Sequence, residues 1–288
     1  MKRELEEVGG VESLSKAHTV LRDAVVIVVM LVIGGATFAD WKVGDPALYY
    51  QLPTYSGGWD VYSEWGTGPL ANEGYGAADD WTATTTAHIK DIHFWGSWKN
   101  DVVGVTGKIL IQIFSNDTSD PAFPRPDELL WSNVINEGQY TKQIVYTGAT
   151  KNQSWYDPRQ TDEWILNEHK KIYQYNIPNI ANSFLQQAGH TYWLEISMDF
   201  QGCDWGWKTT PSVSGNSAVF WDSYETWGPH CYWWRHPEIE WKWTQLKTPL
   251  HYCDPRVPQD LAFVITPEPA TLFLLAIGAA AALRKRSR

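Results

Sequence analysis

The sequence predicts an all-β protein, a two-sheet sandwich of jelly-roll-like type with one short helix. Apolar and polar side chains alternate with a period of two along much of the chain, as in residues 107–115 and 191–199. Clusters of Asn, Asp, Gly and Pro separate these stretches, and few stretches have a helical period. About ten short strands divided by turns are typical of a sandwich.

The N-terminal region predicts a signal peptide over residues 1–39. Residues 24–33 (AVVIVVMLVI) have the length of a signal hydrophobic region and are too short to span a membrane stably. Small residues follow, and cleavage after Ala36 or after Ala39 fits them. The first 23 residues carry a net charge of −1, whereas a signal peptide begins with a short positive segment. We therefore expect translation to start further downstream, near Val20.

Residues 40–266 are predicted to form a single β-sandwich domain, since no repeat or low-complexity linker divides them. Alternation and enrichment in β-branched and aromatic residues predict strands at 90–95, 107–115, 128–135, 143–147, 172–177, 191–199, 218–222, 239–244 and 260–265. In 191–199, alternation places Leu194 on the core face and Glu195 on the opposite face. The predicted helix covers 179–188, with Gly189 as its C-terminal stop.

The C-terminus combines three elements in a fixed order. Pro267, Glu268 and Pro269 precede an apolar run at 270–283, and a basic end follows that includes Arg284, Lys285 and Arg286. Fourteen helical residues span about 21 Å, less than the roughly 30 Å of a bilayer core. The basic residues resist transfer and keep that end in the cytoplasm.

This arrangement resembles the PEP-CTERM sorting signal of Gram-negative bacteria. The resemblance implies an exosortase-type membrane protease as partner, transient insertion in the inner membrane and removal of the tail. The protein would then reach the cell surface or the extracellular matrix. The alternative is an ordinary C-terminal tail anchor, which leaves the Pro-Glu-Pro tripeptide without a role.

Eight short strings of the domain also resemble an uncharacterised β-rich ectodomain family of bacterial exported proteins that carry this C-terminal signal. They are ADDW (78–81), DIHFWGSW (91–98), PDELLW (126–131), WYDP (155–158), IYQYNI (172–177), YWLEI (192–196), GWKT (206–209) and DLAFVIT (260–266). The resemblance spans roughly residues 75–266. It implies one β-rich domain and supplies no catalytic residues.

The charge of the predicted mature region limits its partners. Residues 40–266 contain 15 Lys and Arg against 27 Asp and Glu, a net charge of −12. Such a surface repels nucleic acid and anionic lipid, so neither is an expected partner.

The three cysteines, Cys203, Cys231 and Cys253, predict one disulfide and one free thiol in an exported protein. A metal site that uses His230 and His236 with two of these cysteines is the alternative. The spacing of these residues does not favour it, because the sequence contains no CxxC or HxxxH pair.

All 18 tryptophans lie in the predicted mature region, and aromatic faces stack on sugar rings. Trp95, Trp131, Trp241 and Trp243 have strand-like neighbours and are expected in the core, whereas Trp59, Trp65, Trp205 and Trp207 lie among Gly and Cys and are expected in loops. The densest aromatic stretch gives the candidate glycan-binding residues Trp227, Trp233, Trp234, Arg235 and His236. Packing of this stretch beneath long loops is the other interpretation.

Acidic residues give two further candidates. Asp79 and Asp80 are adjacent and so point to opposite faces if they lie in a strand, and in a loop they would cap a turn, bind Ca²⁺ or contact sugar. Glu195 and Glu240 are the pair considered for a glycoside hydrolase, which needs two carboxylates across a cleft.

These observations favour a non-enzymatic exported protein, structural or glycan-associating, without a resident cofactor. A secreted glycoside hydrolase or lyase is the alternative. The sequence contains no HExxH, GxSxG or Walker-type motif.

Overall fold

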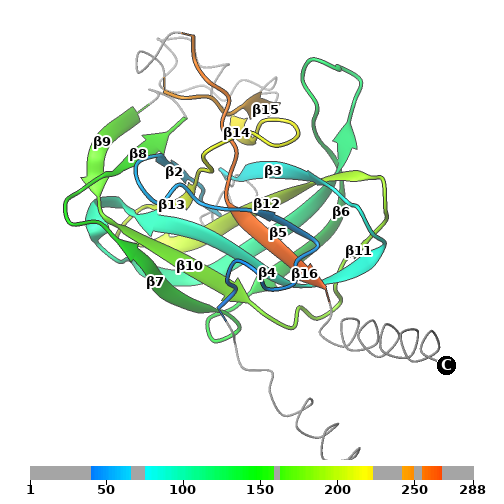
Figure 1. Ribbon diagram of the computed structural model, residues 1–288, viewed down its shortest axis with the longest axis horizontal. Coiled ribbons are helices and arrows are strands. Elements are labelled where there is room, and N and C mark those ends of the chain that lie inside the picture. Colours follow the sequence, from blue (N-terminus) through cyan, green and yellow to red (C-terminus); the bar gives the residue numbers. More distant parts are fainter. Residues whose placement is uncertain (1–39, 66–74, 159–162, 223–241, 250–254, 268–288) are drawn as a thin grey trace, which may run out of the picture. The chain divides into compact units, whose positions relative to one another are not determined.

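The computed structural model describes residues 40–65, 75–158, 163–222, 242–249 and 255–267, which form two β-sheets (Figure 1). The larger sheet contains ten strands. Seven follow one path in the order β1 (Tyr49–Gln51), β16 (Phe263–Pro267), β4 (Ala87–Trp98), β13 (Trp205–Lys208), β2 (Trp59–Tyr62), β8 (Gln153–Asp157) and β9 (Glu163–His169). The other three join through the long strand β4, and they are β10 (Lys171–Ile177), β7 (Thr141–Thr147) and β11 (Leu185–Gln186).

The smaller sheet has six strands. Their order is β15 (Lys242–Gln245), β14 (Val219–Asp222), β3 (Ala77–Thr82), β12 (Thr191–Gln201), β5 (Val105–Asp117) and β6 (Arg125–Ile135). The chain crosses repeatedly between the sheets, for example from β3 to β4 and then to β5, as in a jelly roll. Among the described strand pairs, β2 with β8 is the one parallel pair.

The main core lies between the two sheets and follows the predicted alternation. Ile109, Ile111 and Ile113 of β5 have no exposed surface and lie beside Leu194 and Ile196 of β12. The larger sheet contributes aromatic residues of β4, β10, β13 and β16 to the same cluster. The predicted two-sheet sandwich is therefore confirmed.

Both sheets also bury part of their outer faces, which simple alternation does not predict. On the larger sheet, Trp41 covers Trp95, Ile172 and Val264. On the smaller sheet, Trp193 is fully buried in a cluster with Ala78 and Val219 of the neighbouring strands. Trp41 precedes β1, whereas Trp193, Ala78 and Val219 lie on strands of the smaller sheet itself, so each sheet has apolar side chains on two faces.

The predicted helix at 179–188 is wrong. Asn179 and Asn182 have left-handed backbone conformations, with φ of 54° and 52°, and β11 pairs with the start of β4. The backbone N–H of Ile180 donates to the carbonyl of Lys90 at 2.8 Å. Pairing with the edge of β4 therefore satisfies backbone groups that a helix would have satisfied internally.

The other predicted strands are observed with shifted ends. Residues 242–245 of the predicted strand 239–244 form β15, and the rest of it lies outside the described residues. The last predicted strand, 260–265, begins later and continues to Pro267 as β16. No helix in the described part of the chain is long and apolar enough to span a membrane.

Candidate functional site

The residues predicted to bind glycan lie outside the described part of the chain. Trp227, Trp233, Trp234, Arg235 and His236 all fall within 223–241, and so does Glu240. The sorting residues after Pro267 also lie outside it. The glycan prediction for this stretch therefore stays a prediction, and the geometry bears on the other candidates.

Three tryptophans expected in loops prove to be core residues, whereas Trp65 lies outside the strands and is half-buried. Trp59 lies in β2, and Trp205 and Trp207 lie in β13, where both are fully buried. The indole N–H of Trp207 donates to the carbonyl of Ala262 at 2.8 Å. Glycine neighbours indicated loops, but here Gly206 allows close strand packing: a Cβ at this position would lie 2.8 Å from the carbonyl carbon of Asp60.

Asp79 and Asp80 lie within β3, both buried and on opposite faces of the strand. The Oδ2 atom of Asp79 accepts hydrogen bonds from the backbone N–H of Leu261 at 2.6 Å and from Gln51 Nε2 at 3.0 Å. The two carboxylate oxygens of Asp80 accept from the backbone N–H and side-chain amide of Asn216, at 3.0 and 2.8 Å. Both carboxylates therefore fasten neighbouring loops to the strand.

A third carboxylate belongs to the same region. Asp260 Oδ1 accepts from the backbone N–H of Ala218 at 3.3 Å, and its Oδ2 from that of Ser214 at 2.5 Å. Burial raises the pKa of Asp80 to about 6 and that of Asp260 to about 7. Among the described residues, no group of three His, Cys, Asp or Glu side chains is arranged to hold a metal ion.

Glu195 is buried, which corrects the expectation of a solvated position on the outer face of β12. Its side chain is 9% exposed and lies against Gly76, where a Cβ would clash with the carboxyl group. Burial raises its pKa to about 8. The outer face of β12 is covered, so the alternation of apolar and polar residues did not predict that Glu195 is buried.

Cys203 is a free cysteine, and its Sγ lies 3.1 Å from the carbonyl oxygen of Lys99. Burial raises the pKa of this thiol. Cys231 and Cys253 lie outside the described residues, so the single predicted disulfide stays a prediction.

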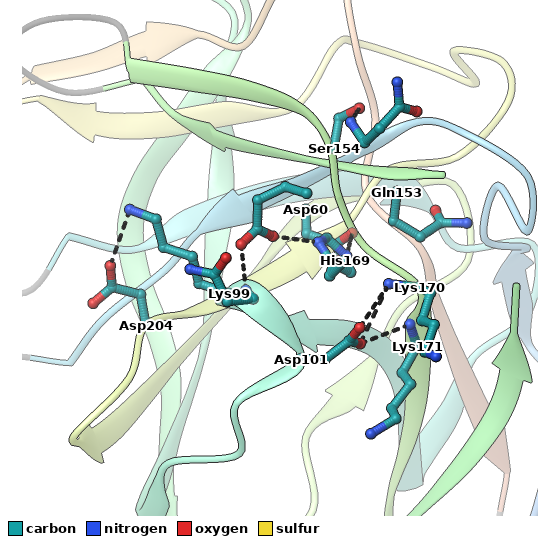
Figure 2. Close-up of polar contacts among 12 residues, drawn as sticks. Asp60, Lys99, Asp101, Gln153, Ser154, His169, Lys170, Lys171 and Asp204 are labelled. Carbon is teal, nitrogen blue, oxygen red and sulfur yellow. Dashed lines mark hydrogen bonds and ion pairs between the residues drawn. The ribbon is translucent and has the colours of Figure 1, made fainter. Parts of the chain in front are cut away.

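A buried charge network that the sequence did not predict joins four strands of the larger sheet (Figure 2). Lys208 Nζ on β13 lies 3.0 Å from Asp60 Oδ2 on β2 and 2.6 Å from Gln153 Oε1 on β8. His169 Nε2 on β9 lies 2.9 Å from the same oxygen of Asp60. Its Nδ1 lies 2.7 Å from Glu168 Oε2. All these side chains are at least nine-tenths buried.

The charges in this network compensate one another. Burial alone would raise the pKa of Asp60, but the positive charges of Lys208 and His169 outweigh it and lower that pKa. Burial opposes the charged form of His169 too, yet Asp60 raises its pKa above the ordinary value. Burial lowers the pKa of Lys208. With no exposed surface on Asp60, Lys208 or His169, the network connects buried strands and presents no reactive atom to solvent.

An open groove lies where the ends of β5 and β6 meet β11 and the start of β12. It has a volume of about 640 Å³ and is lined by Ser115, Asn116, Leu130, Phe184, Leu185, Gln187, Gly189, His190, Thr191 and Tyr192. Sequence reasoning missed it because its lining comes from three separate segments of the chain, at 115–116, 130 and 184–192.

Aromatic rings form one wall of this groove. The Phe184 and Tyr192 rings meet edge to face with centroids 5.1 Å apart, and His190 lies nearly parallel to Tyr192 at 6.2 Å. The Tyr192 hydroxyl accepts from the backbone N–H of Gln187 at 3.0 Å, which fixes the loop that carries His190. Leu130 and Leu185 expose apolar surface along the same groove.

Comparison with known proteins identifies two families. A model described as Domain of unknown function (DUF7901) matches residues 47–266, and a model of the PEP-CTERM protein-sorting motif matches residues 266–287. No curated protein and no solved structure matches the chain. The match over 47–266 covers all of the region that the sequence strings pointed to and extends about 28 residues further toward the N-terminus, and the second match confirms the sorting signal.

Proposed function

We propose, from the premise that this chain belongs to the DUF7901 family and ends in a PEP-CTERM sorting motif, that it associates with glycan at the cell surface or in the extracellular matrix. The motif implies export and sorting by an exosortase. The observation that carries the glycan association is the open groove beside Phe184, His190 and Tyr192.

The chemistry of the groove suits a saccharide chain. Aromatic and aliphatic side chains offer apolar surface to the C–H faces of sugar rings, and Gln187 and Thr191 offer an amide and a hydroxyl at the same place. The groove is lined by polar and apolar residues without a Lys, Arg, Asp or Glu. The negative charge of the whole protein favours neutral over anionic glycan.

We propose no catalytic role. A glycoside hydrolase needs two carboxylates that reach one bond of the substrate. Glu195, one of the two considered, is buried and only 9% exposed. A polysaccharide panel assayed for release of reducing ends would contradict this part of the proposal if it gave turnover.

The test is retention of the mature protein on the exopolysaccharide of its own host. The double variant Gln187→Ala/His190→Ala removes two exposed groove side chains, and we expect its dissociation constant to rise about tenfold. Gln201→Ala is the control, because Gln201 is exposed at the opposite end of β12. Absence of retention of the unaltered protein, or equal binding by both variants, contradicts the proposal.

A further inference from the structure

The sorting motif begins inside the folded domain. The match to the motif starts at residue 266, and β16 continues to Pro267, the first residue of the Pro-Glu-Pro tripeptide. Thr266 and Pro267 are both buried. The sandwich and the sorting signal therefore share two residues.

These two residues pair with one neighbouring strand. Thr266 lies opposite Asp91 of β4, and its hydroxyl donates to Asp91 Oδ2 at 3.3 Å. Pro267 lies opposite Ile89 after a register shift. By contrast, Phe263–Ile265 pair with β1 on one side and β4 on the other.

A protease binds its substrate as an extended segment whose backbone groups it contacts directly. Backbone that is already part of a sheet is not available for such contacts. We propose that pairing with β4 makes the folded domain compete with the exosortase for Thr266 and Pro267, so that cleavage requires the end of β16 to detach.

The geometry confines this detachment to the strand end. Thr266 and Pro267 lie beyond the pairing with β1, and the register shift interrupts their ladder with β4. A strand end that pairs on one side only can open locally. The part of β16 that pairs on both sides opens only when the whole sheet opens. The folded domain therefore slows sorting without blocking it.

A release variant tests the proposal in the full-length precursor, expressed in the native host with its own exosortase. Insertion of Gly-Ser-Gly-Ser after Ile265 moves Thr266 and Pro267 away from β4 and leaves the motif intact. Pulse-chase labelling should show conversion of precursor to product about threefold to thirtyfold faster, as expected if the strand end is held by one or two hydrogen bonds. The same insertion after Gly138, in the turn between β6 and β7, should leave the rate unchanged.

A locked variant tests the opposite direction. A disulfide in Asp91→Cys/Thr266→Cys ties the end of β16 to β4, and conversion should stop until a reductant is added. The control Gln112→Cys/Ser132→Cys links two paired residues of β5 and β6 in the smaller sheet, and it should be processed normally. The single variant Asp91→Cys should not be slowed.

Two results overturn the proposal. One is a release variant that is processed at the unaltered rate or more slowly while its body stays resistant to trypsin. The other is a locked precursor, with the disulfide verified by mass spectrometry, that is processed as fast as the unaltered chain.

Discussion

Lys208 Nζ lies 3.0 Å from Asp60 Oδ2, and neither side chain has any exposed surface. Two charges this deep cost free energy to bring out of water, and their attraction recovers it only if other partners satisfy the remaining groups. Gln153 bonds Lys208 and His169 bonds Asp60 Oδ2, whereas the buried Asp60 Oδ1 has no hydrogen-bond partner among the described residues. Their strands, β8 and β9, are adjacent to each other and close one end of the larger sheet.

Lys208→Met should lower the free energy of unfolding by about 3–5 kcal/mol, because it leaves the Asp60 carboxylate buried with less compensating charge. Urea denaturation followed by tryptophan fluorescence measures the change. Lys151→Met is the matched control, since Lys151 is exposed in the turn before β8 and should change stability by less than about 0.5 kcal/mol.

The double variant Asp60→Asn/Lys208→Met should cost less than the sum of the two single variants, because both charges are then absent. Strictly additive losses of unfolding free energy would contradict a compensation between the charges of Asp60 and Lys208. A loss below 1 kcal/mol for Lys208→Met alone would contradict it too.

The strands were predictable where local alternation matches burial on one face. In β5 and β12 the isoleucines and leucine alternate with polar residues, and the facing sheet buries them as expected. Prediction failed where pairing with a segment distant in sequence decides the secondary structure. The 179–188 segment has an acceptable helical composition, but its backbone pairs with β4, which precedes it by about ninety residues.

The candidate site was less predictable than the fold for the same reason. Trp205 and Trp207 looked like loop residues because Gly206 separates them, yet that glycine marks close packing of β13 on β2. Lys208 directly follows the Trp-Gly-Trp run, which did not predict a strand. Its partner Asp60 lies 148 residues away, and no local pattern connects the two.

Stability should fall as pH rises from about 5 to about 8. Burial raises the pKa of Asp80 to about 6, of Asp260 to about 7 and of Glu195 to about 8. A carboxyl whose pKa is raised on folding stabilises the protein below its unfolded pKa of about 4, and this contribution disappears as pH rises through the folded pKa. The raised pKa of His169 acts in the same direction. Thermal denaturation across this range checks the slope.

Glu195→Gln should remove much of that slope, because a neutral amide has no proton to lose when buried. The shift of the Glu195 pKa corresponds to several kcal/mol, so the variant should exceed the unaltered protein in stability at pH 9. Glu137→Gln, an exposed glutamate in the turn after β6, is the control and should leave the profile unchanged. A profile of Glu195→Gln that parallels the unaltered protein would contradict burial of this carboxyl.

Gly206→Ala should destabilise the domain by about 1–3 kcal/mol or more through overpacking. A Cβ there would lie 2.8 Å from the carbonyl carbon of Asp60 on the adjacent strand β2 and 3.0 Å from Trp155 Cζ3 on β8, one strand further along the sheet. Chemical denaturation measures the loss. Ala87→Ser, at the half-buried start of β4, adds one atom and serves as a comparison. Equal stability of Gly206→Ala and the unaltered protein would refute the close packing of β13 on β2.

Removal of calcium should leave the melting temperature unchanged, although Asp79 and Asp80 form an acidic pair. Their oxygens accept hydrogen bonds from Leu261, Gln51 and Asn216, so the protein's own donors already compensate the buried carboxyls. Asp80→Ala should instead cost about 1–3 kcal/mol, because it leaves the donors of Asn216 without their acceptor. Calorimetry in EGTA and in millimolar Ca²⁺ distinguishes a hydrogen-bonding role of Asp79 and Asp80 from a calcium-binding role. A melting temperature that falls in EGTA, and recovers with Ca²⁺ only when Asp80 is present, would assign this pair to a cation.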